Sequence, residues 1–479
     1  MPVSSIQKSL AGAVVAAVAA ALNPATASAQ DSADVSLLEE VVVTARKREE
    51  TLIDVPVSIA VLTAKDIEQK GIQNLYDVAM FTPGLTYFDA IQNQLGTPVI
   101  RGISQTNLGT PDRNVAVFYG GVYLANQNAL NLELLDVERI EVVKGPQSAL
   151  YGRNAFNGAI NYVPASPTDD FFAKVGATVG SDARYEARAT VSGPITDTIR
   201  GRIAISYNTF DGSWENQAEP SGGLGGFETK NVSAMVDWKP NDAFSARLFG
   251  YRTEDLRDSA AMYLFPSLNC GPAGVAPTVF CGDIPTRDTL SANADSLAFQ
   301  RHVSLGSLDL SYDFGPVQIK SQTAVFNANT DNYSDQTLGE ANGQGFFFNI
   351  VNRAAPTTVL RRQRVPVFNG SGKGDSRAQS QELRLEGQVG KNFDWSVGGF
   401  LFNNDFVSFG RLVYDGRVLA PTERPQTDIF FFVNLNPNTA APNVEPWNNM
   451  VNLSRNEAQD EQRAFFGTVE FRPTDQWTV

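Results

Sequence analysis

From Phe171 onward, hydrophobic and polar residues alternate along a series of short segments. In one of them, alternate positions hold Ile199, Gly201, Ile203, Ile205 and Tyr207, and the positions between include Arg200, Arg202 and Ser206. A period of two predicts β-strands with one apolar and one polar face. We expect about ten complete strands and the start of an eleventh at 477–479. Such strands suit a membrane β-barrel with its apolar face outward, or a soluble sandwich with that face inward, and alternation alone does not distinguish them.

The connections between these strands favour the barrel. Short turns are expected at 193–198, 240–243, 315–316, 390–392 and 473–476, and long loops near 210–228, 255–300, 329–377 and 406–461. After a first hairpin at 181–183, long and short alternate, as in outer-membrane barrels. Aromatic residues at strand ends predict an interfacial girdle; they are Trp238, Phe244, Trp395 and Trp477. At about 30 residues per strand, residues 171–479 correspond to half of a barrel of about 22 strands.

Residues from about 50 to 165 show a mixed pattern. Strands are expected at 54–62, 98–102, 114–124 and in the strand–turn–strand 137–163, and helices are expected from Thr63 and over 74–81. Gly145, Gly152 and Gly158 stand where the chain must reverse tightly or let another backbone approach closely. These elements predict a small α+β domain before the barrel strands.

The first residues predict export. Lys8 precedes an apolar run over 10–22, and Ala27-Ser28-Ala29 is a cleavage triplet, so residues 1–29 are interpreted as a signal peptide. Residues 30–49 form a short tether that contains Glu40-Val-Val-Val-Thr-Ala45. These β-branched residues favour an extended backbone. The segment suits pairing with the sheet edge of another protein, or a first core strand of this one.

Composition excludes several function classes. The formal charge of −14 argues against nucleic acid as a partner. Cys270 and Cys281 are expected to close a small disulfide loop in an oxidising compartment. His302 is the only histidine and has no cysteine nearby, so we expect no catalytic residue, no metal site and no cofactor.

Six motifs, in this order, resemble the TonB-dependent receptors of Gram-negative outer membranes. Glu40, Val41, Val42, Val43, Thr44 and Ala45 resemble the TonB box. Thr82-Pro-Gly-Leu85, Ile100-Arg101-Gly102, the run from Asp136 to Gly145-Pro146, and Leu150-Tyr151-Gly152-Arg153-Asn154 resemble plug signatures. Gln381-Glu-Leu-Arg-Leu385 resembles a recurrent barrel strand.

The resemblance implies a 22-stranded antiparallel transmembrane barrel that contains an N-terminal α+β plug. The domains expected are the signal peptide, the tether with the box (30–49), a plug (50–165) and the first half of the barrel (171–479), the chain being a fragment of a longer receptor. The implied function is active uptake of a ferric siderophore or similar bulky nutrient across the outer membrane. It is driven by the proton gradient through TonB, ExbB and ExbD. Alternatives are uptake of a carbohydrate, cobalamin or aromatic compound, or a passive porin.

Ligand contacts are expected in the long loops. Candidates are Phe346, Phe347 and Phe348 for an apolar or aromatic ligand, and Arg361, Arg362 and Arg364 for an anionic ferric chelate. The phenylalanines can also be interpreted as packing loop on loop. The arginines can also be interpreted as contacting lipopolysaccharide phosphates or pairing with the acidic loops. Arg101 and Arg153 are expected to form ion pairs between plug and barrel, because buried charges need partners.

Overall fold

A computed structural model describes residues 42–44, 50–53, 55, 57–89, 96–103, 113–148, 152, 154–217, 223–259, 261, 299–335, 347–352, 359–364, 368–390, 392–414, 423–426 and 450–471. By its internal contacts the chain separates into residues 1–42 and 43–479. The helices and strands described below lie in the second unit, apart from Val42 at the start of the first strand. Within the described ranges, no helix is long and apolar enough to cross a membrane.

The N-terminal part is mixed, as predicted. Its strands are β1 (Val42–Val43), β2 (Glu50–Thr51), β3 (Ser58–Thr63), β4 (Leu85–Asp89), β5 (Gly96–Ile100), β6 (Val115–Tyr119), β7 (Val122–Tyr123), β8 (Val137–Lys144) and β9 (Gly158–Pro164). Its helices are α2 (Ala64–Lys70), α3 (Leu75–Met80) and the 3-10 turn η1 (Gln127–Ala129). A five-stranded sheet has the order β3-β8-β9-β6-β7, and β4 pairs with β5.

Local sequence signals set the two helices. Thr63 caps α2 and Asn74 caps α3, and in both a capping box joins the cap to an aspartate, Asp66 or Asp77. The hydrogen bonds from Lys70 and Thr63 lower the pKa of Asp66 to about 2. Gly71 ends α2 in the left-handed conformation with φ 65°.

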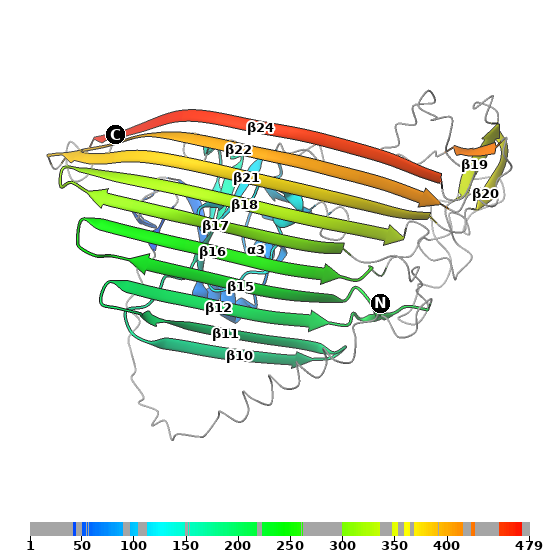
Figure 1. Ribbon diagram of the computed structural model, residues 1–479, viewed down its shortest axis with the longest axis horizontal. Helices are drawn as coiled ribbons and strands as arrows, with labels where there is room; N and C mark the ends of the chain where they lie inside the picture. The colour runs from blue at the N-terminus through cyan, green and yellow to red at the C-terminus, as the bar shows by residue number, and fades with distance from the viewer. Residues whose placement is uncertain are drawn as a thin grey trace, which may run out of the picture. The chain divides into compact units, whose positions relative to one another are not determined.

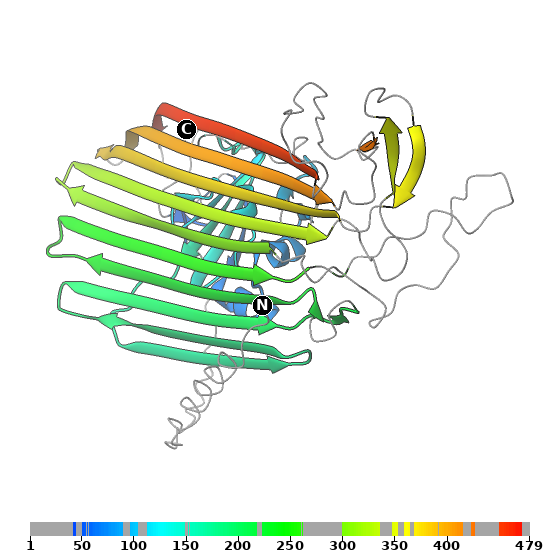
Figure 2. The same ribbon diagram turned by 45° about the vertical axis from the view of Figure 1, so that its right-hand side comes forward.

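Ten antiparallel strands form the large sheet (Figures 1 and 2). In sheet order, which is also chain order, they are β10 (Phe172–Gly180), β11 (Arg184–Pro194), β12 (Ile199–Phe210), β15 (Phe227–Trp238), β16 (Phe244–Arg257), β17 (Phe299–Asp313), β18 (Val317–Asp335), β21 (Phe368–Val389), β22 (Phe393–Tyr414) and β24 (Met450–Phe471). The ten complete strands are confirmed. The eleventh, at 477–479, lies outside the described residues.

The connections alternate in length as predicted, but several strands are longer than expected. β18 continues to Asp335, β21 begins at Phe368, β22 ends at Tyr414 and β24 begins at Met450, so each extends into a segment interpreted as loop. The added residues of β21, such as Gly370, Ser371 and Gly372, carry no apolar face. They extend the strand because an unbroken backbone ladder pairs them with β18 and β22.

The apolar face of the large sheet is the exposed one. Ile203 and Ile205 are about half exposed, whereas Ser206 and Asn208 on the other face are buried. The same holds across the sheet, where the exposed apolar residues include Val232, Leu248, Leu308, Val325, Leu383, Val397, Leu401, Phe465 and Val469. This arrangement is the reverse of a soluble sandwich and matches a lipid-facing barrel wall.

Two further small sheets lie within the long connections. β13 (Trp214–Glu215) pairs with β14 (Gly223–Leu224) between β12 and β15. β19 (Phe347–Asn352) and β20 (Val359–Arg364) lie between β18 and β21, and β23 (Glu423–Gln426) lies between β22 and β24. These last three strands form one sheet with the order β20-β19-β23.

Candidate functional site

Thr44 lies on a buried carboxylate of the five-stranded sheet. Its backbone N–H donates to Glu141 Oε1 at 2.8 Å, and its hydroxyl donates to Glu141 Oε1 at 3.1 Å and Oε2 at 3.2 Å. Asn161 Nδ2 donates to Thr44 Oγ1 at 3.3 Å and to Glu141 Oε2 at 3.5 Å. Arg139 Nε donates to Glu141 Oε1 at 2.8 Å. We name Thr44, Arg139, Glu141 and Asn161 the box cluster.

Strand register builds the box cluster. Glu141 and Asn161 are directly paired between β8 and β9, so their side chains share one face. Arg139 is two positions before Glu141 and therefore lies on the same face. The Glu141 side chain is fully buried, and a buried carboxylate is tolerated here because a guanidinium, an amide and a hydroxyl surround it. The cluster can hold an extended segment by hydrogen bonds, beside the buried Val43.

The structure places only part of the predicted TonB box. Val43 is fully buried beside Thr44, and Val42 is exposed. Glu40, Val41 and Ala45 lie outside the described residues. The pairing of β1 with β2 and the burial of Val43 are features of a first strand of this domain, whereas the hydrogen bonds of Thr44 to Glu141 are contacts that can open for pairing with another protein.

The predicted glycines adopt backbone conformations with positive φ. Gly145, Gly152 and Gly158 have φ values of 115°, 76° and 150°. At Gly158 an added Cβ would lie 2.2 Å from the carbonyl oxygen of Val143, so only glycine lets β8 and β9 approach there. Pro146 is exposed, and Tyr151 and Arg153 lie outside the described residues.

Two of the predicted signatures meet at one turn. The backbone N–H of Arg101 donates to the carbonyl oxygen of Gly84 at 2.8 Å, which joins Ile100-Arg-Gly102 to Thr82-Pro-Gly-Leu85. Gly84 and Gly102 have φ values of 78° and 76°. The ion pair expected for Arg101 is not found: Arg101 is exposed, and among the described residues no carboxylate pairs with it. The backbone of Arg101 has a φ of 55° and forms part of the turn.

Other arginines, on the large sheet, hold the N-terminal part. Arg202 of β12 binds Asp136 through two hydrogen bonds of 2.6 and 2.5 Å. Arg301 of β17 is almost fully buried and donates to the carbonyl oxygens of Asn128 at 2.6 Å and Asn131 at 3.1 Å. The same guanidinium pairs with the buried Asp255 of β16. In the sequence, these arginines appear only as members of the polar face of their strands. That pattern does not predict which polar residue contacts a partner.

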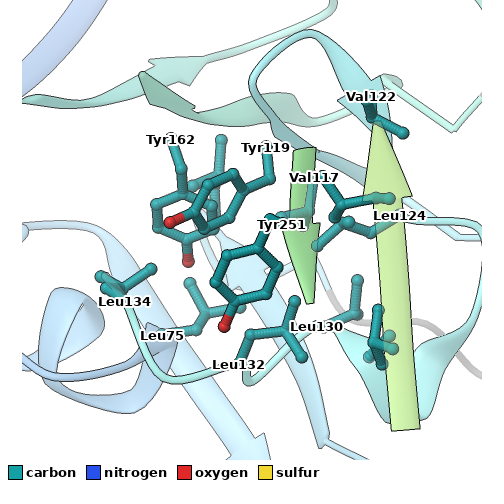
Figure 3. Packing of buried hydrophobic residues seen from close by; sticks show 14 of the residues in the cluster. Leu75, Val117, Tyr119, Val122, Leu124, Leu130, Leu132, Leu134, Tyr162 and Tyr251 are labelled. Atoms are coloured by element: carbon teal, nitrogen blue, oxygen red, sulfur yellow. The ribbon is translucent and has the colours of Figure 1, made fainter. Parts of the chain in front are cut away.

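A stack of aromatic rings joins the two parts (Figure 3). Tyr119 of β6 lies 4.8 Å from Tyr251 and 5.9 Å from Phe249 between ring centroids, and both partners belong to β16. Tyr119 donates to the carbonyl oxygen of Leu135, and Tyr251 to that of Glu133, each at 2.8 Å. Burial raises the pKa of Tyr119 above its ordinary value. The hydrophobic core is therefore continuous from the N-terminal part to the inner face of the large sheet.

Glu133 is a buried acid at this junction. Burial raises the pKa of its carboxyl to about 7, an effect that Arg188 and Asn208 oppose and that Glu186 and Asp255 reinforce. Arg188 lies 3.8 Å from Glu133 Oε1, and Asn208 Nδ2 donates to Oε2 at 3.4 Å. The folded protein therefore holds a proton on Glu133 from the ordinary pKa of 4.5 up to about pH 7.

We predict that Glu133 makes the folded state less stable as pH rises. Its contribution is greatest below pH 4.5 and is lost between pH 4.5 and about 7, because only the unfolded chain ionises in that interval. The loss is at most about 3 kcal/mol. Glu133→Gln should flatten the difference between urea unfolding midpoints at pH 5 and pH 8, measured in detergent. Glu228→Gln, on the sheet and less buried, is the control; an equal flattening in both variants would contradict the assignment to Glu133.

The remaining predicted residues are only partly placed. Phe347 and Phe348 belong to β19, and Arg361, Arg362 and Arg364 belong to β20, where the backbone path is described. Phe346, Cys270 and Cys281 lie outside the described residues. His302 lies on β17, with Nδ1 3.9 Å from a Glu254 oxygen. Among the described residues, no group of three or more His, Cys, Asp or Glu side chains could hold a metal ion.

Comparisons with known proteins agree with this architecture. Residues 51–159 match the model of the TonB-dependent Receptor Plug Domain. The chain is 28% identical over 220 residues to the vitamin B12 transporter BtuB of Photobacterium profundum, a match covering 46% of this chain and 36% of the transporter. It is 30% identical over 224 residues to the pesticin receptor of Yersinia enterocolitica, covering 46% of this chain and 32% of the receptor. The chain thus spans about a third of the length of these curated relatives.

A solved structure resembles the fold. The ferripyoverdine receptor of the Pseudomonas aeruginosa outer membrane, bound to ferripyoverdine, has a TM-score of 0.60 and 16% identity, covering 91% of this chain and 52% of that one. The plug-domain match, the ten-stranded sheet and its exposed apolar face converge on one family, whose members are transporters and not enzymes. This chain belongs to the TonB-dependent receptors of the outer membrane.

Proposed function

We propose that this receptor takes up a ferric siderophore or a similar bulky, scarce nutrient, driven by the proton gradient through TonB with ExbB and ExbD. In this proposal residues 1–29 are the signal peptide, 30–49 the tether with the TonB box, 50–165 the plug and 171–479 barrel wall. The proposed surroundings are outer-membrane lipid and lipopolysaccharide, with no nucleic-acid partner and no cofactor.

The observation that carries the proposal is the docking of Thr44 on Glu141. Three hydrogen bonds from Thr44 reach one buried carboxylate, and Val42, one residue before the buried Val43, is exposed. A segment held by a few charge-assisted hydrogen bonds can be exchanged for pairing with another protein's sheet edge.

The class of ligand has two candidates. The ferripyoverdine receptor of similar fold favours a ferric chelate, and the vitamin B12 transporter at 28% identity favours cobalamin. We place the ferric chelate first, because β20 carries Arg361, Arg362 and Arg364 in a long connection and cationic residues attract anionic chelates. Uptake assays with radiolabelled iron chelates and radiolabelled cobalamin separate the two candidates.

A proline in the exposed part of the box tests coupling to TonB. Val42→Pro removes a backbone donor that strand pairing with a partner requires, and it should reduce uptake to the level of cells treated with a protonophore. Val42→Ile keeps the donor and the β-branched side chain and should leave uptake within about twofold of the wild-type protein. Undiminished uptake by Val42→Pro would overturn the proposed coupling.

A further inference from the structure

The plug covers the inner face of the large sheet unevenly. Inner-facing residues of β16 and β17, such as Phe249, Thr253 and Arg301, are almost fully buried. On β10, by contrast, every residue from Phe172 to Gly180 is exposed. β10 therefore lies on a side of the wall that the plug leaves largely uncovered.

Edge position alone does not explain the exposure of β10. β10 and β24 are the two edges of the ten-stranded sheet (Figure 1). Gln462, on the inner face of β24, is nevertheless half-buried, and its Nε2 atom would lie 3.9 Å from a Cβ added to Gly152 of the plug. The plug thus covers the sheet as far as one edge and leaves the inner face of the other edge largely open.

Strand register identifies the inward residues of this open side. Lys174 of β10 donates from Nζ to both carboxylate oxygens of Glu68, in α2 of the plug, at 2.9 Å each. The residues at steps of two from Lys174 along β10 share its inward face, and β11 contributes the residues directly paired with them. We name this set the open face; its members are Gly176, Thr178, Gly180, Arg184, Glu186 and Arg188.

Small residues of β10 leave space beside the charged side chains of β11. A Cβ added to Gly176 would have no atom of the plug or the wall within 4 Å. At Gly180, the three nearest atoms would all belong to Arg184 of β11. The plug therefore does not pack on this part of the wall.

The contacts that cross from the open side to the plug are polar and partly exposed. In the pair of Lys174 with Glu68, the two side chains are 58% and 69% exposed. Arg184 Nη2 donates to Gln73 Oε1 at 3.1 Å, and Gln73 Nε2 donates to Glu186 Oε2 at 3.4 Å. Exposed polar pairs contribute little to stability. This side of the plug therefore separates from the wall at lower cost than the buried contacts on β16 and β17.

The same side of the plug is the one nearest the box segment along the chain. Glu68 and Gln73 directly follow β3, and β3 is an edge strand of the five-stranded sheet. In the proposed coupling to TonB, a pull on the box segment acts on β3 and α2 before it acts on segment 128–136. Displacement of α2 would uncover the open face further.

We propose that the transported solute passes along the open face, between strands β10 and β11 and the α2 side of the plug. The side chains there are hydroxyl, carboxylate and guanidinium groups, which can exchange hydrogen bonds with a solute that carries polar groups over its surface. The proposal rests on the proposed uptake function and specifies the side of the plug on which the solute passes.

The test uses a bulky, charged maleimide that does not cross lipid, so it does not depend on the identity of the natural solute. Its target is Thr190→Cys, with Cys270 and Cys281 replaced by serine. Thr190 is an inward residue of β11, between Arg188 and the turn that joins β11 to β12. In the proposed orientation this turn is periplasmic, so a reagent added outside intact cells reaches Thr190→Cys only after passing the open face.

A tryptophan on the open face should block the reagent. Thr178→Trp should slow labelling of Thr190→Cys at least about tenfold in energised cells, because the indole fills the space that the reagent needs. Ala177→Trp, at the neighbouring outward-facing position, should change the rate less than about twofold. Gly176→Trp and Gly250→Trp form a second matched pair, because a Cβ at either glycine has no atom within 4 Å but Gly250 faces outward on β16. Urea unfolding midpoints check that the variants fold, and either pair decides the result.

The outcomes separate this proposal from the proposed function. No labelling of Thr190→Cys in energised cells, or equal labelling in the inward and outward tryptophan variants, would refute passage along the open face. Labelling that Val42→Pro leaves undiminished, but that Thr178→Trp still blocks, would support the passage and overturn the proposed coupling to TonB.

Discussion

Arg301→Met is expected to lower the free energy of unfolding by about 3 kcal/mol, the lower end of the cost of breaking a buried ion pair. The substitution leaves the carbonyl oxygens of Asn128 and Asn131 without their buried donor. It also leaves Asp255, whose side chain is almost fully buried, with only the more exposed Arg257 as cationic partner, 3.2 Å away. The remaining pair is the reason for the lower end of the range.

Urea unfolding in detergent, followed by tryptophan fluorescence, measures this effect. Arg252→Met is the control, because Arg252 forms an ion pair with Glu254 two residues along the same strand, β16, and both side chains are about half exposed. Exposed pairs contribute less than about 1 kcal/mol. Arg301→Met with Asp255→Asn should recover part of the loss, since the buried carboxylate charge is removed and Arg257, which loses its pair with Asp255, is partly exposed. Equal costs for Arg301→Met and Arg252→Met would show that the buried guanidinium does not anchor the plug.

Glu141→Gln is expected to expose the box segment about tenfold to a hundredfold more often in the absence of any ligand. The carboxylate accepts hydrogen bonds from Thr44 and from the guanidinium of Arg139, and bonds to a charged group contribute about 1.5–3 kcal/mol each. An amide oxygen can still accept from Thr44, but without the charge. The docked state is therefore weakened and not abolished.

The rate of maleimide labelling at Val43→Cys reports this opening, with Cys270 and Cys281 replaced by serine. Val43 is fully buried in the docked state, so a cysteine there reacts only when the segment leaves. Glu138→Gln is the matched control: it lies on the same strand and contacts Arg139, but its side chain is about half exposed and does not touch Thr44. If both substitutions changed the labelling rate equally, Glu141 would not be what holds the box.

The contacts of Arg301 and those of Glu141 hold two different parts of the N-terminal region, and they differ in kind. Its segment 128–136 is bound to the large sheet by Arg202, Arg301 and Tyr251, through contacts that are mostly buried. The described part of the box segment is held by the pairing of β1 with β2, by the burial of Val43 and by the hydrogen bonds of Thr44 to Glu141. In the proposed coupling to TonB, a force applied at the box acts first on these contacts, and Glu141 sets how readily they open.

Local patterns in the sequence were sufficient for the elements and the family. Period-two alternation gave ten strands, the Thr63 and Asn74 caps gave two helices, and three glycines marked backbone geometry that no other residue adopts cheaply. Strand ends were predicted less well, because the ladder extends strands such as β21 through Gly/Ser residues with no apolar face. These features depend on neighbours within a few residues, or on the backbone alone.

Tertiary structure decided which side of the sheet faces outward and which charges meet. Alternation is the same for a barrel wall and a sandwich. The lengths of the connections favoured the barrel, and the burial of Ser206 and Asn208 beside the exposed Ile203 and Ile205 shows which face is outward. Arg101 was expected to pair and is exposed, whereas Arg202 and Arg301, which looked like any polar residue of their strands, hold the plug. Thr44 and Glu141, 97 residues apart in the chain, meet beside the paired strands β8 and β9. The sequence by itself determined local periodicity and backbone conformation, and folding decided the partners, because the energy of a buried charge depends on groups brought together from distant positions.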